Sequence, residues 1–506
     1  MAMENPFEGK EVWFGVGSQD LYGEEALRQV AEQSGEIVDA LNATGKIPVK
    51  VVLKPTLKSS DGVKAFMVEA SANPNVIGVI TWCHTFSPGP RCGSAALEVL
   101  TKPLLQLNTQ HHFEIPWETI DMDFMNLNQA AHGDREFGYI LTRLGINRKI
   151  VVGHYTDPAV AEEIGTWARA CAGWDASNNM KVMRWGDNMR NVAVTEGDKT
   201  EAERVFGASI NTWAVNELVA AYEAVKDDQV KSIIEDYKVK YDVDPALLDA
   251  KYDSLFIAAK EEAAMVNMMR ANGCTAGVDN FEDLGCSPAA AGRWPQRFPS
   301  EYGFGFSAEG DWKTAVLVRI GAVMGYGLEG GASLMEDYSY NFTPGNEMIM
   351  GSHMLEVSPS VGTIAKPKLE IHPLGIGGKA DPVRLVFTVA PKKDAVVVSM
   401  SDVRERFRLT MNLVDVVEPL GELKQLPCAR GLWKPQPDLK TSAECWLRSG
   451  ASHHTCMTTS VGREAWEDFA RIAGVELATI DANTKAAEFE RDLEISEMYH
   501  RLNNRH

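Results

Sequence analysis

The sequence lacks several features that mark other classes of protein. Its eight cysteines are scattered, without a Cys-x-x-Cys pair or the dense spacing of a disulfide framework, so we expect reduced and mostly buried thiols. The first ten residues contain no basic segment followed by a long apolar stretch, and no later run reaches membrane-spanning length. These absences make the cytoplasm the expected compartment and exclude a membrane partner.

Basic residues are scarce relative to acidic ones. The chain has 50 Lys and Arg against 70 Asp and Glu, a net charge of −20. Nucleic-acid binders need clustered Lys and Arg to displace counterions, so this class is excluded, whereas a neutral sugar is indifferent to the acidity. A dinucleotide fingerprint is also missing, because only Gly15 and Gly17 precede Gln19 and no third glycine or ribose-binding acid follows at the required spacing.

A chain of 506 residues with 45% hydrophobic content exceeds what one core usually supports. We expect an N-terminal doubly wound α/β domain at 1–179, a central α/β domain at 180–331 and a β-rich C-terminal domain with a terminal helix at 332–506. Short apolar runs alternate with helical stretches in the first part, as in βα units around a parallel sheet. The expected strands are 12–16, 49–53, 76–81, 104–107 and 150–153, with a helix over 24–41.

The central and C-terminal regions have a different pattern of predicted helices and strands. The central region contains a long helical stretch over 245–272. From about 332 the pattern becomes rich in turns and strands, with β signals at 385–389 and 395–400, and a helix is expected over 485–502.

Four segments carry residues that bind divalent metal ions. Carboxylates and imidazoles together form a mixed oxygen and nitrogen site, which suits Mn²⁺ better than an ion that prefers thiolates. Glu336 and His353 each follow a turn-forming stretch, where functional side chains are commonly presented. The segments are Ala-Glu309-Gly-Asp-Trp-Lys, Met-Glu336-Asp-Tyr, Gly-Ser-His353-Met-Leu-Glu and Ser-His453-His454-Thr.

These motifs resemble those of L-arabinose isomerases, and the likeness covers nearly the whole chain. Further segments that carry it are Val12–Gly23, Thr81–Pro88, Ile120–Gly138, Trp185–Arg190, Asn211–Val215, Leu374–Pro382 and Leu432–Asp438. The resemblance implies a fucose-isomerase-like architecture and conversion of L-arabinose to L-ribulose, with D-galactose to D-tagatose as a second reaction. His111-His112 and the stretch 286–293 depart from the family pattern.

The resemblance also implies the ligands of one Mn²⁺ per subunit, with Co²⁺ or another divalent ion as an alternative. These ligands are Glu309, Glu336, His353 and His454. Adjacent residues point in different directions on a regular element, so only one of His453 and His454 is expected to coordinate, with His453 in support. Asp311 could orient a metal ligand from behind or hold the substrate, and the alternative is an acid that caps the following helix.

Sugar contacts follow from the same resemblance. Gln19 and Tyr22, which come directly after the first strand, are well placed to touch substrate, although an ordinary polar turn would use the same residues. In the family the histidine that matches His132 reaches the sugar from a neighbouring subunit of a hexamer; a structural imidazole is the alternative. The implied contacts are Gln19, Leu21, Tyr22, His132, Phe281 and Ile376, of which Leu21 and Ile376 could equally be core residues.

Aldose–ketose isomerisation requires a proton to leave C2 and arrive at C1. Two carboxylates that share a site repel, so one has its pKa raised and can act as acid while the other acts as base, which assigns these functions to Glu309 and Glu336. Proton transfer through an enediol and a metal-assisted hydride shift both fit these residues. The competing interpretations are an L-fucose or D-arabinose isomerase, a non-catalytic sugar-binding protein and a structural metal site.

Overall fold

The computed structural model describes residues 3–86, 97–284, 295–373 and 381–503. The chain divides into two compact units. The N-terminal unit holds Asn5–Asp175 and Glu464–Gly474, and the C-terminal unit holds Ala176–Arg463 and the chain from Val475 onward. No helix within the described ranges is both long and apolar enough to cross a membrane. The division into three domains at 179 and 331 stays a prediction.

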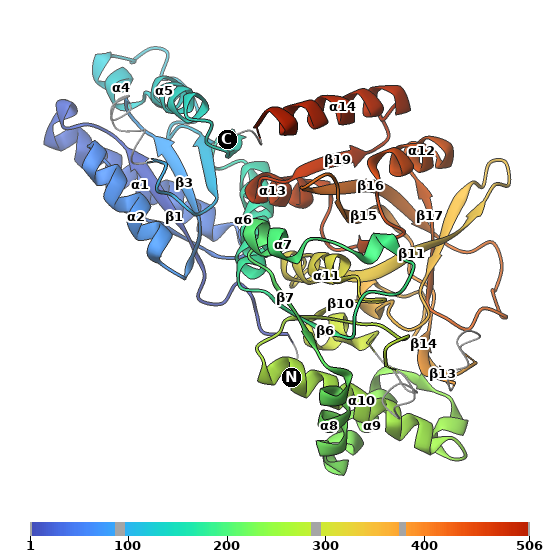
Figure 1. Ribbon diagram of the computed structural model, residues 1–506. Helices are drawn as coiled ribbons and strands as arrows, with labels where there is room; N and C mark the ends of the chain where they lie inside the picture. Colours follow the sequence, from blue (N-terminus) through green and yellow to red (C-terminus); the bar gives the residue numbers. More distant parts are fainter. Residues whose placement is uncertain (1–2, 87–96, 285–294, 374–380, 504–506) are drawn as a thin grey trace. The chain divides into compact units, whose positions relative to one another are not determined.

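The N-terminal unit is built on a five-stranded sheet in the order β2-β1-β3-β4-β5 (Figure 1). All neighbouring strands run parallel, which confirms the doubly wound sheet predicted from the sequence. Every residue of β3 is buried, as expected for a strand covered on both faces. The strands are β1 (Glu11–Gly17), β2 (Lys50–Leu53), β3 (Val76–Cys83), β4 (Leu104–Asn108) and β5 (Lys149–Val152).

The strand order of this sheet reverses between β1 and β3. In open parallel sheets ligands bind outside the carboxyl ends of the strands at such a reversal, so the segments after β1 and β3 are the ligand-facing part of this unit. Helices α1, α2 and α5 contact the strands. The helices of this part of the chain are α1 (Gly23–Ala43), α2 (Ser60–Ala72), α4 (Met122–Leu127), α5 (Ala130–Arg143) and α6 (Pro158–Asn178).

One helix of the N-terminal unit comes from far along the chain. Helix α13 (Arg463–Ala473) is strongly amphipathic and buries Trp466 and Phe469. Asp468 forms an ion pair with Lys149, at 3.2 Å, at the start of β5. The ring of Phe469 lies against Trp174 of α6. The N-terminal unit is therefore completed by a segment that follows His453 and His454 in the sequence.

The C-terminal unit contains a second parallel sheet, in the order β10-β9-β6-β7. Its strands are β6 (Lys181–Trp185), β7 (Ser209–Trp213), β9 (Ala276–Asp279) and β10 (Gly305–Ser307). Its helices are α7 (Lys199–Phe206), α8 (Val215–Ala224), α9 (Asp227–Lys240), α10 (Tyr252–Ala271) and α11 (Trp312–Met324). The helical stretch predicted over 245–272 is interrupted: a 3₁₀ turn covers Pro245–Leu248, and α10 begins only at Tyr252.

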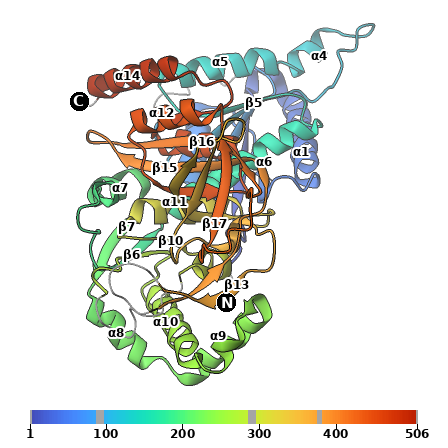
Figure 2. The ribbon, with the colours of Figure 1, turned by 90° about the vertical axis from the view of Figure 1, so that its right-hand side faces the viewer.

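The β-rich part of the C-terminal unit is a seven-stranded sheet in the order β15-β18-β11-β12-β17-β16-β19 (Figure 2). Strand β15 also pairs with β16, which closes a ring of six strands, and β19 adds to β16 in parallel. The predicted β-rich C-terminal region is thus confirmed. The strands are β11 (Ala332–Asn341), β12 (Met348–Ser352), β15 (Lys392–Asp402), β16 (Phe407–Val417), β17 (Arg430–Pro435), β18 (His454–Thr458) and β19 (Glu476–Ile480).

A single apolar core joins the parallel sheet and the ring of strands. It includes Trp185, Phe306, Met335 and Trp433, all fully buried. Burying a side chain of this size contributes about 1.5–3 kcal/mol, so the core fixes β10 and β11 relative to each other. The remaining elements of the unit are β8 (Asp242–Val243), β13 (Lys368–Ile371), β14 (Val383–Val386), α12 (Leu439–Ser449) and α14 (Ala486–Asn503).

The cysteines agree with the sequence prediction as far as the chain is described. Six of them are free and buried: Cys83, Cys171, Cys274, Cys428, Cys445 and Cys456. Cys92 and Cys286 lie outside the described residues.

Candidate metal centre

Glu309 lies in the short loop between β10 and α11, in an uncommon backbone conformation. Its φ of 60° is left-handed, which costs a non-glycine residue about 1–3 kcal/mol and occurs mainly at functional sites. Gly310 follows with φ 79°, and a Cβ there would lie 2.6 Å from Asn188 Cα. The Met189 N–H donates to the Glu309 carbonyl oxygen at 2.9 Å. The Trp185–Arg190 motif therefore shapes the loop that presents Glu309.

Strand register brings the other candidate ligands together. Glu336 on β11 lies opposite His454 on β18 and opposite Ser352 on β12. His353 follows Ser352 directly. At Gly351 a Cβ would lie 2.2 Å from the Trp433 ring, so only glycine allows β12 to approach this closely. Three adjacent strands thus present a carboxylate between two imidazoles.

The ligand atoms of this cluster converge on a small volume. His454 Nε2 lies 3.7 Å from Glu309 Oε2, and His353 Nε2 lies 3.7 Å from Glu336 Oε2 and 4.0 Å from Glu309 Oε1. Two atoms that each lie about 2.1 Å from one ion are at most about 4.2 Å apart, so these separations suit a shared divalent cation. Glu336, His353 and His454 form one candidate metal-binding group, and Glu309, His453 and His454 form another.

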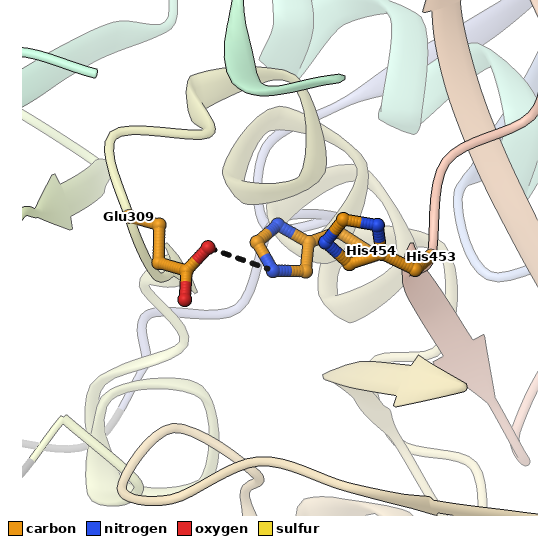
Figure 3. Close-up of side chains that lie close together, drawn as sticks. All are labelled: Glu309, His453 and His454. Carbon is orange, nitrogen blue, oxygen red and sulfur yellow. Dashed lines mark ion pairs between the residues drawn. The ribbon is translucent and has the colours of Figure 1, made fainter. Parts of the chain in front are cut away.

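His453 lies closer to the ligands than the rule for adjacent residues suggests. It precedes β18, where the backbone is irregular, and its ring lies 4.7 Å from that of His454. Figure 3 shows the Glu309 carboxylate facing His454, with His453 beside them. His453 Nε2 is also 3.8 Å from Glu336 Oε1. Both imidazoles therefore reach the cluster, although His453 is the more exposed of the two.

His454 is oriented by a carboxylate. Its Nδ1 lies 3.2 Å from Asp311 Oδ2, while its buried Nε2 has no hydrogen-bond partner among the described residues. Asp311 occupies the N-cap position of α11, but its side chain makes no capping bond and instead accepts from the Thr314 hydroxyl at 2.7 Å. A histidine that donates to a carboxylate and leaves the other nitrogen free is the usual arrangement of a metal ligand. The donor set thus fits a divalent ion.

Glu356 orients His353, as Asp311 orients His454. The sequence did not lead us to predict Glu356 as a site residue. His353 Nδ1 forms a short hydrogen bond with Glu356 Oε2, which also accepts from the Leu355 N–H at 2.8 Å. Burial opposes the charged form of His353, but the carboxylates of Glu356, Glu336 and Glu309 together outweigh this effect and raise the pKa of His353 to about 9. The spacing His353-Met-Leu-Glu356 was the available signal, since it places an acid three residues after a ligand.

The pKa values of the Glu336 and Asp311 carboxyl groups are shifted in opposite directions. Burial raises the pKa of Glu336, and the neighbouring Glu309 adds to this effect while His353 and His454 oppose it. Burial also raises the pKa of Asp311, but Lys313 and His454 outweigh it and hold this pKa below its usual value. Asp311 is therefore a carboxylate at neutral pH, whereas Glu336 holds a proton more readily than an exposed glutamate.

Four of the predicted sugar contacts belong to the N-terminal unit. Gln19 follows β1, and its Nε2 lies 3.5 Å from the Phe86 carbonyl oxygen after β3. Gln129 was not predicted; it donates to the Tyr22 hydroxyl at 3.3 Å and contacts His132 Nδ1 at 3.2 Å. The Phe86 ring lies 4.5 Å from that of His132. Gln19, Tyr22 and His132 are therefore linked at the strand-order reversal, the ligand-facing edge of this sheet.

Leu21 lies in the same segment, and 79% of its surface is exposed, which argues against the core alternative. Phe281 lies in the turn after β9 and is partly buried, in the unit that carries the metal-ligand cluster. Ile376 and the departure at 286–293 lie outside the described residues. His111 bonds to Glu36 at 2.7 Å and belongs to none of the candidate metal groups found in the described chain.

Comparison with known proteins gives family matches along most of the chain. Residues 6–179 match the L-arabinose isomerase N-terminal domain, residues 181–327 the central domain and residues 331–476 the C-terminal domain. The chain belongs to the L-arabinose isomerase family. Curated L-arabinose isomerases of Bifidobacterium longum (strain DJO10A) and Bifidobacterium adolescentis are 85% and 83% identical to it over the full length of both chains. That of Arthrobacter sp. (strain FB24) is 54% identical over 97% of this chain and 96% of its own.

Membership of the L-arabinose isomerase family confirms the resemblance read from the sequence motifs. The alternatives of a non-catalytic sugar-binding protein and of an L-fucose isomerase lose their support, because the curated relatives at 83–85% identity are named L-arabinose isomerases throughout.

Proposed function

We propose that this chain converts L-arabinose to L-ribulose, with slower conversion of D-galactose to D-tagatose. The observation that carries the proposal is the convergence of Glu309, Glu336, His353 and His454, with the free buried Nε2 of His454 at its centre. The names of the 83–85% identical relatives supply the substrate. A sugar sensor would need hydrogen-bonding amides and aromatics but has no use for two carboxylates at a metal site.

Mn²⁺ is the proposed ion, one per chain, held by Glu309, Glu336, His353 and His454. Mixed carboxylate and imidazole ligation supports Mn²⁺ or Co²⁺ over ions that prefer thiolates, and no described cysteine belongs to the cluster. Such an ion supplies Lewis-acid polarisation of a substrate oxygen. Asp311 and Glu356 hold the imidazoles so that Nε2 of His454 lies 3.7 Å from Glu309 and Nε2 of His353 lies 3.7 Å from Glu336.

The proposed proton transfer uses the two glutamates as an acid and base pair. One carboxylate takes the proton from C2 of the open-chain aldose, giving an enediol, and a proton is delivered to C1 while the O2 proton moves to O1. Burial raises the pKa of Glu336, which suits it to hold a proton in this cycle. A glutamate that coordinates through one oxygen keeps its other oxygen for the proton.

The proposed sugar contacts are Gln19, Leu21, Tyr22, His132, Phe281 and Ile376. We further propose a homo-hexamer in which His132 serves the site of a neighbouring subunit. Exposed apolar side chains near His132 support a covered surface there: Met122 and Met125 line a hollow together with His132, and each is more than half exposed. Buried reduced cysteines support a cytoplasmic location. An active monomer in light scattering would contradict the hexamer.

The test is ketopentose formation from L-arabinose by chelator-stripped protein, with and without added Mn²⁺. We expect activity to return with Mn²⁺ and to stay absent in Glu309→Gln, because the amide is a weaker ligand and no base. D-galactose, L-fucose and D-arabinose are assayed in parallel. Turnover of L-fucose or D-arabinose without turnover of L-arabinose would contradict the proposed substrate. No turnover of any of the four sugars would contradict the proposed isomerase activity.

A further inference from the structure

A cavity lies in the N-terminal unit, away from the ligand-facing edge of its sheet. It has a volume of about 200 Å³. Its walls come from the segments that precede β4 and β5, from α6 and from α13. Because Lys102 precedes β4 and Lys149 begins β5, the cavity lies at the amino-terminal edge of the sheet. Gln19 and Phe86 follow the carboxyl ends of β1 and β3, so the two places are at opposite edges.

The lining of this cavity is basic, in contrast to the chain as a whole. Lys102, Arg148, Lys149 and Arg471 line it, and Asp468 is its one acidic lining residue. The chain carries a net charge of −20, so a surplus of three positive charges around so small a volume is a local exception. Positively lined concavities attract and concentrate anions.

Two of these cations make no direct ion pair within the described chain, although Asp175 acts on Lys102 and Asp468 on Arg471 at longer range. Asp175 itself is paired with Lys10, at 2.7 Å. Asp468 is occupied by Lys149 at 3.2 Å, and Arg148 bonds only to neutral acceptors such as the Gln106 side chain at 3.0 Å. Within the described chain, the charged ends of Lys102 and Arg471 make no hydrogen bond or ion pair. Burial lowers the pKa of Lys102, so its charge is held there at a cost that a bound anion would offset.

A neutral donor on the cavity wall is also unsatisfied. Trp167 of α6 lines the cavity and is 1% exposed, and its indole Nε1 has no hydrogen-bond acceptor. Buried donors of this kind are normally paired, and an unpaired one calls for an unseen partner. The cavity thus combines an ammonium and a guanidinium that make no direct ion pair with an unpaired N–H, and this set of donors suits a ligand that only accepts hydrogen bonds.

Another cavity has a basic lining, but its arginines are already paired with carboxylates. A cavity in the C-terminal unit is lined by Arg404, Arg448 and Arg501, but each of these is paired with a glutamate at hydrogen-bond distance. Its cations therefore neutralise the protein's own carboxylates. The cavity of the N-terminal unit differs because, within the described chain, Lys102 and Arg471 make no such direct ion pair with a carboxylate.

We propose that the cavity lined by Lys102, Trp167 and Arg471 binds a phosphate group. A tetrahedral dianion offers acceptor oxygens in several directions, which suits donors from separate elements, and a guanidinium is well adapted to phosphate oxygens. Arg471 belongs to α13, whereas Lys102 precedes β4. The bound group therefore bridges α13 to the sheet and stabilises the segment that completes the N-terminal unit.

The test measures binding of radiolabelled inorganic phosphate to the metal-loaded full chain by equilibrium dialysis, at constant ionic strength set with chloride. Unlabelled glycerol 3-phosphate competes in a second arm, so that stronger or weaker competition than by unlabelled phosphate distinguishes a phosphate monoester from the free ion. We expect one saturable site per chain. Lys102→Gln and Arg471→Gln should each weaken binding about tenfold, since each removes one charge-assisted contact.

Arg448→Gln is the matched control, because it removes a charge from the cavity whose arginines are already paired; its affinity should be unchanged. Circular dichroism melting of each variant without phosphate checks that it is folded. At one phosphate concentration the melting temperature should rise equally in the unaltered chain and the control, and by less in the other two variants. Absence of saturable binding would overturn the proposal, as would equal affinity in all four proteins.

Discussion

The histidines predicted as metal ligands in the C-terminal unit and the histidine predicted to contact the sugar in the N-terminal unit differ in burial and in partner. His353 and His454 of the C-terminal unit are almost fully buried, and each is bound to a carboxylate, Glu356 or Asp311. His132 of the N-terminal unit is exposed, and its recorded side-chain contacts within the described part of the chain are with the neutral side chain of Gln129 and the ring of Phe86. A buried carboxylate fixes an imidazole and strengthens it as a ligand, whereas an amide and an aromatic ring merely position it.

Under the proposed function, the residues of the C-terminal unit carry out the chemistry and those of the N-terminal unit recognise the sugar. Groups that bind an ion must be held within a fraction of an ångström, which strands and a shared core achieve through register and packing. Groups that meet a sugar must stay accessible until it arrives, so they lie on the segments after the strands. Changes in the C-terminal cluster should therefore abolish turnover, and changes in the N-terminal group should mainly weaken binding.

The sharpest test of the comparison is Glu336→Gln. We expect kcat to fall about 10³-fold, because the amide keeps the shape of the side chain but cannot exchange the proton. Steady-state kinetics at saturating Mn²⁺ measure this. Glu347→Gln, an exposed glutamate between β11 and β12, is the control and should leave kcat unchanged. A Glu336→Gln enzyme with normal kcat would remove this residue from the proposed acid and base pair.

The next effect concerns the carboxylate behind His353. Glu356→Gln should weaken Mn²⁺ affinity about 10–100-fold, because the imidazole loses the partner that orients it and raises its basicity. Activity titrated against Mn²⁺ should recover at high metal concentration. Glu370→Gln is the control, since Glu370 also bonds to a histidine, His372 at 2.8 Å, away from the cluster. A loss of activity that no Mn²⁺ concentration restores would mean that Glu356 does more than orient.

His132→Ala tests the other half of the comparison. We expect KM for L-arabinose to rise about tenfold with little change in kcat, as for the loss of one hydrogen bond to substrate. Steady-state kinetics resolve the two constants. His154→Ala provides the control, because His154 is in the same unit and bonds to Thr156. A fall in kcat at constant KM would place His132 with the catalytic groups instead.

The smallest expected effect is a change in the pH dependence of stability. Asp134 of α5 accepts from the Cys83 N–H at 2.8 Å and from Asn108 Nδ2 at 2.9 Å, and burial raises its pKa from 3.8 to about 7. Between these values the folded state holds a proton that the unfolded chain releases. Raising the pH from 5 to 7 therefore lowers the free energy of unfolding, by at most about 1.4 kcal/mol for each pH unit.

Asp134→Asn should remove this part of the slope. Urea unfolding at pH 5 and pH 7 measures it, with Asp123→Asn, an exposed acid of α4, as the control that keeps the slope of the unaltered chain. If Asp134→Asn lost as much stability between the two pH values as the unaltered chain, the buried carboxyl would not be the titrating group.

Much of the fold could be predicted because its signals are local. The run Val76–Thr81 is apolar throughout, which marks a strand buried on both faces, and β3 is such a strand. The break before α10 could not be predicted from apolar spacing, since the 3₁₀ turn at Pro245 depends on a cap by Asp244. The position of α13 in the N-terminal unit could not be predicted either. An amphipathic helix specifies which of its faces is buried, but not which surface covers that face.

By itself the sequence determined the family, the fold class and the set of metal-ligand candidates, because long motifs and short-range patterns survive without coordinates. Only the tertiary structure decided which atoms converge. The pairing of Glu336 with His454 depends on the register of β11 and β18, and the unpaired Nε2 of His454 depends on Asp311, 143 residues away along the chain. Such contacts come from packing between distant segments, which no local pattern encodes.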